Sequence, residues 1–191
     1  MSEITFVLFD TAIGRCAIVW NARGIAGVGF PEGNEQATRK RLLRRHPSAR
    51  EASPPRDVQE AIDDIVALLA GDLRDLSHVR LDMAGLSDLQ RRVYDIARTI
   101  PAGATLTYGE IADRLGDRVL ARDVGEALGD NPFPIIVPCH RVLAAGGKLG
   151  GFSAPGGGRT KLRLLAIEGA QPGGPTLFDD LPLTAPRPRQ V

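Results

Sequence analysis

Residues 107–142 read TYGEIADRLGDRVLARDVGEALGDNPFPIIVPCHRV, and this stretch decides the fold of the second half of the chain. Thr107 followed three residues later by Glu110 forms a capping box, which predicts a short helix that Gly116 ends. A second helix is expected from about residue 117 to 128, ended by Gly129. Two short helices joined by a tight turn that contains glycine are typical of a helix-turn-helix.

The same stretch continues into a proline-rich segment that carries a cysteine. Pro132, Pro134 and Pro138 exclude a helix and predict a stiff, extended backbone leading to Cys139. A catalytic cysteine needs a base or a positive charge nearby, because the thiolate is the nucleophile and the ordinary pKa is about 8.5. His140 is adjacent, but successive side chains of an extended chain point to opposite faces, so contact requires a turn or a bridging water. From the residues alone, Cys139 is either a nucleophile or a small buried hydrophobe.

Helical signals surround this segment on both sides. Ser87 and Gln90 form another capping box, and the helix they begin must end before Pro101. Further on, a mobile glycine-rich loop over residues 146–158 is expected to precede a last helix over 161–167, with Thr160 as its N-cap and Gly169 as its end. Residues from about 171 onward are rich in proline and are expected to form a largely disordered tail.

The N-terminal part of the chain has a different pattern. Three short apolar runs at residues 4–9, 16–20 and 25–30 are separated by turn residues and predict an antiparallel meander. Apolar residues at helical spacing predict one covering helix over residues 57–70, which Gly71 ends. Between them lies a basic cluster at residues 39–45, interpreted as a solvated helix face, with direct DNA contact as the alternative.

Composition limits the classes of protein that remain. The 191 residues carry 24 Lys and Arg against 23 Asp and Glu, so any binding of nucleic acid depends on locally placed charge. No apolar run is long enough to span a membrane, and the N-terminus lacks the features of a secretory signal, which predicts a reducing, cytoplasmic location. Two cysteines without a CxxC pair predict neither a disulfide framework nor a structural zinc site, and no metal is expected.

The segment from Asn131 to Val142 closely resembles the active-site signature of the O6-alkylguanine-DNA alkyltransferases. The resemblance runs from about Leu89 to Gly169 and includes residues 107–112, 121–125, 146–153 and 164–169. It implies an α/β (α+β) fold in two parts. A small, strand-rich, ribonuclease H-like domain over residues 1–80 precedes a helical, winged-helix-like domain over 84–170, which carries the helix-turn-helix, DNA binding and alkyl transfer.

The resemblance also implies a chemistry, namely the direct and irreversible transfer of an alkyl group from guanine to Cys139, which consumes the protein. Cysteine suits this displacement because it supplies a soft, ionised nucleophile near neutral pH. By family position His140 is the base, acting through a water, and Glu168 is hydrogen-bonded to its other ring nitrogen. Tyr108 helps to neutralise the leaving purine. Arg122 fills the gap left in the DNA by the flipped base.

Further positions of the pocket follow from the resemblance in the same way. Asn131 braces the turn before the active-site segment, Val142 offers its carbonyl to the guanine amine, and Ser153 places a backbone amide near the alkylated oxygen. Phe152 and Pro134 form apolar pocket walls. Two departures are expected to matter: Asp123 follows Arg122 where the family commonly has alanine, and residues 154–158 replace the usual pair of glycines after Ser153.

The expected partner is double-stranded DNA carrying O6-alkylguanine, and O4-alkylthymine is a second possible substrate. Neither a cofactor nor an obligate protein partner is expected. Two other functions remain open from the sequence. A non-repairing sensor of alkylated DNA shares this scaffold but has another residue in place of Cys139. A thiol hydrolase acting on a small molecule through Cys139 and His140 predicts repeated turnover and no role for Arg122.

Overall fold

The computed structural model describes residues 3–170. Its N-terminal part is a four-stranded sheet with the order β3-β2-β1-β4. The strands β1 (Thr5–Thr11), β2 (Gly14–Asn21) and β3 (Gly24–Gly29) form the predicted antiparallel meander. The short strand β4 (Arg50–Glu51) was not predicted and pairs in parallel with β1. With only two exposed residues, it leaves no alternation for a sequence pattern to detect.

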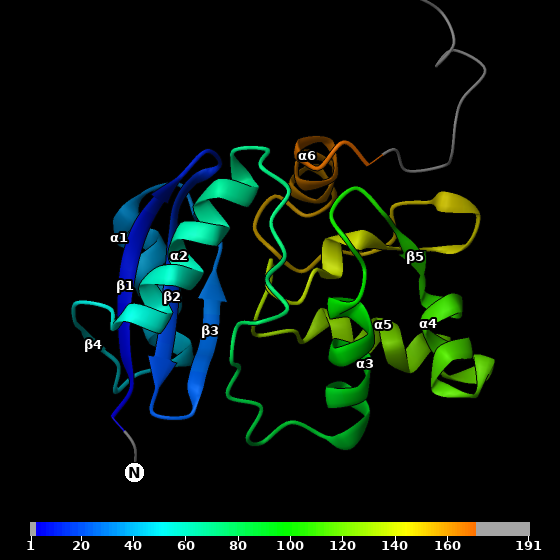
Figure 1. Ribbon diagram of the computed structural model, residues 1–191, viewed down its shortest axis with the longest axis horizontal. Coiled ribbons are helices and arrows are strands. Elements are labelled where there is room, and N and C mark those ends of the chain that lie inside the picture. The colour runs from blue at the N-terminus through cyan, green and yellow to red at the C-terminus, as the bar shows by residue number, and fades with distance from the viewer. Residues whose placement is uncertain (1–2, 171–191) are drawn as a thin grey trace, which may run out of the picture.

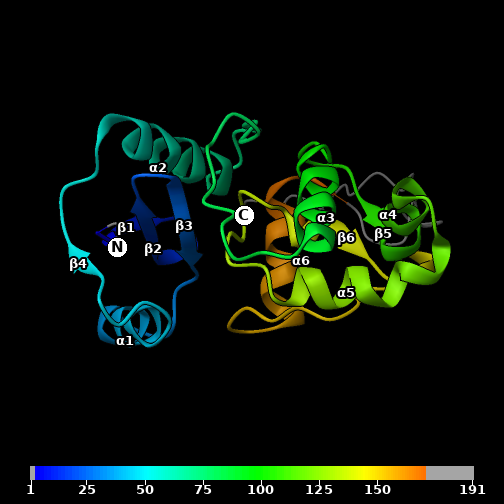
Figure 2. The ribbon, with the colours of Figure 1, turned by 90° about the horizontal axis from the view of Figure 1, so that it is seen from below.

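Two helices cover this sheet on opposite faces, as Figure 2 shows. Helix α1 (Glu35–Arg45) begins at Asn34, whose side chain accepts a hydrogen bond from the Ala37 amide. Helix α2 (Arg56–Leu69) confirms the helix predicted over residues 57–70. The apolar face of α2 packs into the main core, whereas Leu42 of α1 packs in a smaller cluster on the other side of the sheet.

The C-terminal part is mainly helical (Figure 1). Its two strands, β5 (Leu106–Thr107) and β6 (Val142–Leu143), pair in parallel. Up to residue 170, where the described chain ends, four α-helices and three short 3-10 helices complete it: α3 (Asp88–Arg98), α4 (Tyr108–Leu115), η1 (Arg118–Leu120), α5 (Ala121–Gly129), η2 (Cys139–Arg141), η3 (Ala145–Gly147) and α6 (Gly158–Ile167).

The helix-turn-helix is formed by α4 and α5, and the structure changes one detail of the prediction. Both capping boxes are present, at Ser87 and at Thr107, and Gly116 ends α4 in the left-handed conformation. The second helix, however, begins at Ala121 rather than near residue 117. The Asp117 carboxylate accepts a hydrogen bond from the Val119 amide and begins the 3-10 helix η1 instead. Helix α5 also includes Gly129, so the predicted stop lies one residue early.

The segment from 131 to 142 is not simply extended, as the prolines predicted. Ile135 has a φ of 77°, and the Val137 amide donates to the Phe133 carbonyl, which turns the chain back on itself. A 3-10 turn then covers Cys139–Arg141. The prolines exclude an α-helix but do not prevent these turns, which the buried contacts of Ile135 and Val137 stabilise.

The last helix also begins differently from the prediction. Helix α6 begins at Gly158 and has no side-chain cap, because the Thr160 hydroxyl donates instead to the Pro155 carbonyl at 2.5 Å. Its end near Gly169 is as predicted. The predicted disordered tail from residue 171 lies outside the described residues.

The two parts of the molecule share one main hydrophobic core, which joins residues of β2, β3 and α2 with residues of α3, α4 and α5. Backbone hydrogen bonds join them as well: the Val28 amide donates to the Pro132 carbonyl at 2.9 Å, and Ile25 pairs with Arg80 and Asp82 of the connecting segment. Within residues 3–170, no helix combines the length and the apolar character needed to span a bilayer.

Candidate active site

The turn at Cys139–Arg141 places three functional side chains in different directions from consecutive residues. It lies between the Asn131 loop and β6, in the interior of the C-terminal part. His140 and Arg141 are buried, whereas Cys139 keeps partial access to solvent. Successive side chains point to opposite faces only along an extended backbone. Because Cys139 and His140 lie in a 3-10 turn, that alternation does not keep their side chains apart.

Glu168 joins two of these residues. His140 Nε2 donates to Glu168 Oε1 at 2.9 Å, because the carboxylate can only accept. Arg141 binds the same carboxylate in a fork, with Nε at 2.9 Å from Oε2 and Nη2 at 2.8 Å from Oε1. Arg141 Nη1 also donates to the Ile100 carbonyl at 2.6 Å. The contact between His140 and Glu168 has the geometry that the resemblance implies, whereas the role of Arg141 was not predicted.

The pKa shifts in this network favour an ionised Glu168 and a neutral His140. Burial opposes ionisation of Glu168, but hydrogen bonds from His140 and Arg141 outweigh it and lower the pKa of the carboxyl to about 2. Burial lowers the pKa of His140, although Glu168 opposes this shift. His140 is therefore neutral at neutral pH, with its proton on Nε2. Its Nδ1 atom is buried and makes no hydrogen bond to the described residues, which leaves it free to accept a proton.

Cys139 itself is a thiol in the resting protein. Burial raises its pKa, and the Asn131 side chain and the positive charge of Lys161 partly oppose the shift. A thiol of this kind must lose its proton as it reacts, so the nearby neutral imidazole has a chemical purpose.

Lys161 is the second functional residue that sequence reasoning missed. Its side chain is fully buried, and Nζ donates to the Val142 carbonyl at 2.5 Å and lies 5.9 Å from the centre of the Tyr108 ring. Burial lowers the pKa of Lys161 to about 8, while the neighbouring Cys139, when ionised, opposes the shift. A signal was available, because Lys161, Leu164 and Leu165 share the buried face of one helix, where a lysine is rarely found without a function.

A slot in the surface opens on Cys139 beside the helix-turn-helix. Glycines and the Tyr108 ring line this slot, and we call it the base slot. Its lining residues are Tyr108, Gly125, Leu128, Gly129, Cys139, Gly151, Phe152 and Ser153. Gly125 and Gly150 pack against the Tyr108 ring, and a Cβ atom on Gly150 would lie 3.1 Å from the Tyr108 hydroxyl oxygen. Burial raises the pKa of Tyr108, so its hydroxyl keeps its proton and can donate a hydrogen bond.

The structure places the other predicted residues around these groups. Asn131 is buried; its side-chain oxygen accepts from the Phe133 amide and its amide donates to the Val137 carbonyl, so it braces the loop before Cys139. The Ser153 hydroxyl donates to the Gly129 carbonyl. Phe152 packs edge-on against Phe30 of the N-terminal part. Pro134 and Val142 do not line the base slot.

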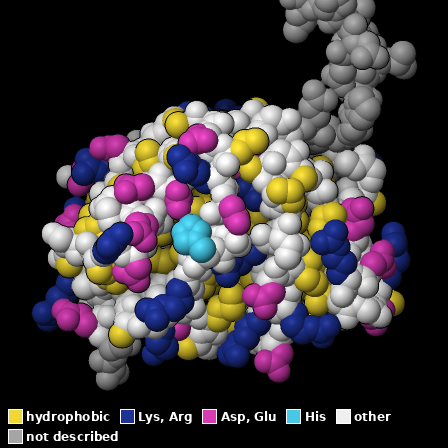
Figure 3. Space-filling model, in the orientation of Figure 1, with side chains coloured by type: hydrophobic (Ala, Val, Ile, Leu, Met, Phe, Trp, Pro, Cys, Tyr) yellow, Lys and Arg dark blue, Asp and Glu magenta, His cyan; other side chains and the backbone are white. Residues whose placement is uncertain are grey.

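Arg122 lies on α5 with its side chain almost fully exposed, which suits a residue that enters DNA. Its Nε atom is 3.1 Å from Glu126 Oε1, an exposed pair of little energetic weight. Asp123 lies in the first turn of the same helix. Figure 3 shows basic and acidic side chains interspersed over the face seen there, in keeping with the near-zero net charge. In the part of the chain that the structure describes, no group of three or more His, Cys, Asp or Glu side chains could hold a metal ion.

Comparison with known proteins agrees with this geometry. Residues 88–170 match the family model described as 6-O-methylguanine DNA methyltransferase, DNA binding domain. The methylated-DNA–protein-cysteine methyltransferase of Methanothermobacter thermautotrophicus is 36% identical over 152 residues, which cover 80% of this chain and 78% of that protein. The protein of the same name from Mycobacterium bovis is 48% identical over 120 residues, covering 62% and 70%.

A solved structure extends the likeness over nearly the whole fold. Mycobacterium tuberculosis OGT in complex with DNA superposes with a TM-score of 0.70 at 34% identity, covering 86% of this chain and 92% of the other. Because the likeness in sequence includes both the DNA-binding part and much of the N-terminal part, the chain belongs to the methylated-DNA–protein-cysteine methyltransferase family.

Proposed function

We propose that this protein repairs DNA by transferring the alkyl group of O6-alkylguanine to Cys139 in a single turnover. The observation that carries the proposal is the buried His140, whose Nε2 is held by Glu168 while its Nδ1 makes no hydrogen bond to residues 3–170. This arrangement gives a neutral base beside a thiol whose pKa is raised. DNA is the partner, residues 84–170 carry its recognition and the chemistry, and O6-alkylguanine is the specific substrate we assign.

The reaction is a displacement at a saturated carbon. The thiol proton passes through a water to His140 Nδ1, and Glu168 stabilises the imidazolium that forms. The Cys139 sulfur bonds to the alkyl carbon while the bond from that carbon to O6 breaks. The electron pair stays on the purine, whose developing negative charge Tyr108 stabilises by donating a hydrogen bond from its hydroxyl. A thioether remains, and it resists hydrolysis because it has no acyl carbon for water to attack.

Two residues missed by sequence reasoning fit these steps. Arg141 keeps Glu168 ionised, because its fork supplies the positive charge that a buried carboxylate requires. Lys161 holds the Val142 carbonyl and supports negative charge on the Cys139 sulfur. We assign both as positioning residues. The contact of the Val142 carbonyl with the guanine amine, which the resemblance implies, stays a prediction, because Val142 does not line the base slot.

Access to Cys139 requires the damaged base to leave the duplex. The base slot lies beside α5, and rotating a base into it costs a few kcal/mol of stacking and pairing. Arg122, whose side chain is exposed on α5, fills the gap in this proposal. The protein acts in the cytoplasm, where thiols stay reduced.

Intact-mass analysis tests this proposal. The full chain is mixed with a several-fold excess of a duplex that contains one O6-methylguanine, and its mass is measured over time. We expect the protein to gain one methyl group and then stop. An unmodified protein that binds the duplex would indicate a sensor, and product formed beyond one equivalent from a small ester or amide would indicate a hydrolase.

A further inference from the structure

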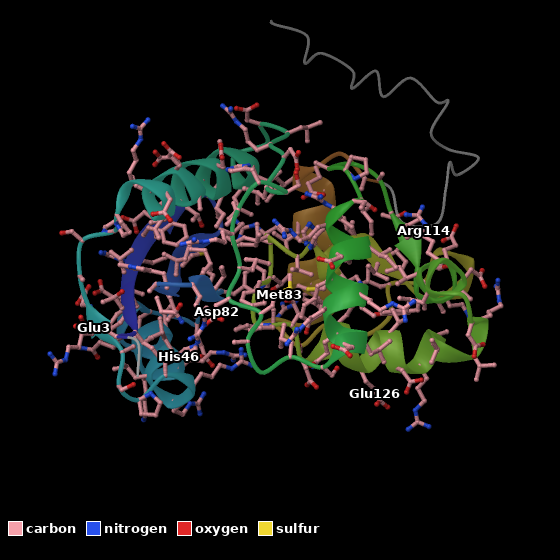
Figure 4. All side chains as sticks on the ribbon, turned by 60° about the horizontal axis from the view of Figure 1, so that its bottom comes forward. Glu3, His46, Asp82, Met83, Arg114 and Glu126 are labelled. Atoms are coloured by element: carbon pink, nitrogen blue, oxygen red, sulfur yellow. The ribbon has the colours of Figure 1, made fainter. Side chains whose placement is uncertain are left out.

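A second cavity opens on Cys139 from the side of the N-terminal sheet. It shares Cys139, Phe152 and Ser153 with the base slot, and Pro134 joins them from the C-terminal part. Its opposite wall is built by β3 and α1, so we call it the interface cavity. Figure 4 shows His46, which follows α1, and Glu126 of α5 both in the lower half of the view. Because Cys139 lines both hollows, it lies where the base slot and the interface cavity meet.

The sequence of β3 creates this space. Gly27 and Gly29 both line the interface cavity, and because alternate residues of a strand share one face, neither contributes a side chain there. A Cβ atom on Gly27 would lie 3.3 Å from His46 Nε2. A Cβ atom on Gly29 would make only ordinary contacts with Ala17, at 3.5 Å or more. Larger side chains at these two positions would fill the cavity.

The wall supplied by α1 is positively charged. Arg41 and Arg45 lie one helical turn apart on the face that lines the cavity, together with Thr38 and Leu42. Arg41 Nη1 is 3.4 Å from Glu32 Oε1 and is partly neutralised, whereas Arg45 makes no salt bridge to the described residues. Among the described residues that line the cavity there is no aspartate or glutamate. Burial, and then the charge of Arg45, lower the pKa of His46, so it is neutral at neutral pH.

The geometry of displacement connects this cavity to the substrate. The sulfur, the attacked carbon and the leaving O6 must lie nearly in line, so the rest of a large substituent projects to the side of that axis. With the purine in the base slot, the interface cavity is the adjoining space that is also lined by Cys139. We propose that it receives the distal part of large O6 substituents and favours those that end in a carboxylate. This inference rests on the proposed function and deepens it.

The step itself is unchanged by such a substituent. The Cys139 sulfur bonds to the benzylic or methylene carbon, the bond from that carbon to O6 breaks, and the proton follows the same route to His140. The distal carboxylate takes no part in bond making. It gains only from the electrostatic attraction of the exposed Arg45 and the half-buried Arg41 on the cavity wall.

Three free bases of similar size test the charge preference without DNA. The rate of thioether formation on the full chain is measured with O6-benzylguanine, O6-(4-carboxybenzyl)guanine and O6-[4-(aminomethyl)benzyl]guanine. We expect the carboxylate to react faster than the amine, and Arg45→Glu to lower the carboxylate-to-amine rate ratio by about tenfold. Arg44→Glu makes the same change of charge on the same helix, but Arg44 faces away with Lys40 and Leu43, and the ratio is expected to stay unchanged.

A second variant tests the space rather than the charge. Gly29→Val adds a side chain that suits a strand, and we expect it to lower the rate with O6-benzylguanine relative to that with O6-methylguanine in a duplex. Circular dichroism confirms that each variant folds. The inference is overturned if the wild type reacts with methylated duplex but with none of the three bases, or if Arg45→Glu leaves the ratio unchanged.

Arg45→Glu can also reveal a different role. If it weakens binding to duplexes with and without a lesion and leaves the ratio unchanged, α1 is a DNA-binding surface and the inference is wrong. If the wild type transfers no methyl group from duplex DNA, the proposed function itself fails, and that result is separate from the rate ratio.

Discussion

The two cysteines of this chain occupy contrasting environments. Cys16 lies in β2, fully buried, with its sulfur 3.6 Å from the Thr11 hydroxyl, and burial raises its pKa to about 11. Burial also raises the pKa of Cys139. The difference lies in the neighbours: Cys139 is followed by the buried base His140, is near the charge of Lys161, and borders two cavities. Burial alone does not distinguish a nucleophile from a core residue, whereas a base and room for a substrate do.

The strongest test of this difference between Cys16 and Cys139 is to remove each sulfur in turn. We expect Cys139→Ser to abolish methyl transfer from an O6-methylguanine duplex, because a hydroxyl is far less ionised than a thiol at neutral pH. Cys16→Ser should retain transfer at one methyl per protein. Peptide mass spectrometry locates the methyl group, and DNA binding by Cys139→Ser is measured in parallel. A methyl group on Cys16, or loss of DNA binding with Cys139→Ser, would contradict the assignment.

The next largest effect on the alkylation rate concerns His140, the base beside Cys139. We expect His140→Ala to slow alkylation by a factor of about 10² to 10⁴, the usual loss for a general base. Glu168→Ala should also slow the reaction, and the double variant should be little slower than the worse single variant, because both residues act on one proton. Rates come from a time course of intact mass.

Thermal unfolding controls this prediction, since Glu168→Ala leaves Arg141 buried without its partner. Arg141→Met in the Glu168→Ala background removes that uncompensated charge. If the losses of His140 and Glu168 prove additive while the variants stay folded, Glu168 supports only the fold.

A third prediction separates delivery of the substrate from reaction at Cys139. Arg122→Ala should slow repair of a duplex by about tenfold or more, because the side chain offsets part of the cost of unstacking. Its reaction with free O6-benzylguanine should be nearly unchanged. Arg56→Ala is a matched control, because Arg56 forms a similar exposed pair with Glu60 four residues on, in α2. Equal loss with both substrates would show that Arg122 organises the site.

The smallest expected effect concerns Lys161, which has no counterpart near Cys16. Folding lowers its pKa from 10.5 to about 8, so between these pH values the unfolded chain binds more protons and this group makes stability rise with pH. Lys161→Met should remove that rise and, at pH 7, stabilise the fold by about 1 kcal/mol while slowing alkylation. Urea unfolding at pH 7 and pH 10 measures the difference between the two proteins. A lower stability of the variant at both pH values would contradict this prediction.

Much of the fold follows from local signals. The capping boxes at Ser87 and Thr107 depend on two side chains three residues apart, and the meander depends on short apolar runs, so both could be predicted. The start of α5 at Ala121 and the turn at Ile135 could not, because a side-chain hydrogen bond of Asp117 and tertiary packing determine them. The same limit applies to the site. His140 and Glu168 are brought together across 28 residues, and only the family resemblance indicated their contact.

The roles of the basic residues of α1 could not be predicted from the sequence pattern. Lys40 and Arg44 do lie on a solvated face, as expected, but Arg41 and Arg45 line the interface cavity beside Cys139. Nothing in the composition of the cluster separates the two pairs. Their roles depend on how the N-terminal sheet packs against the loop that carries Asn131, which is a long-range property.

The main core of this protein has a consequence for how it unfolds. Because one continuous set of apolar side chains joins Ile18 and Val28 of the sheet to Val93 and Val124 of the helical part, neither part retains a complete core alone. We therefore expect one cooperative transition rather than two, with coincident loss of strand and helix signals. A cavity made in this core by a residue that lines neither hollow at Cys139, for instance by Ile18→Ala, should then lower the fraction of repair-competent molecules without altering the rate constant of those that remain folded.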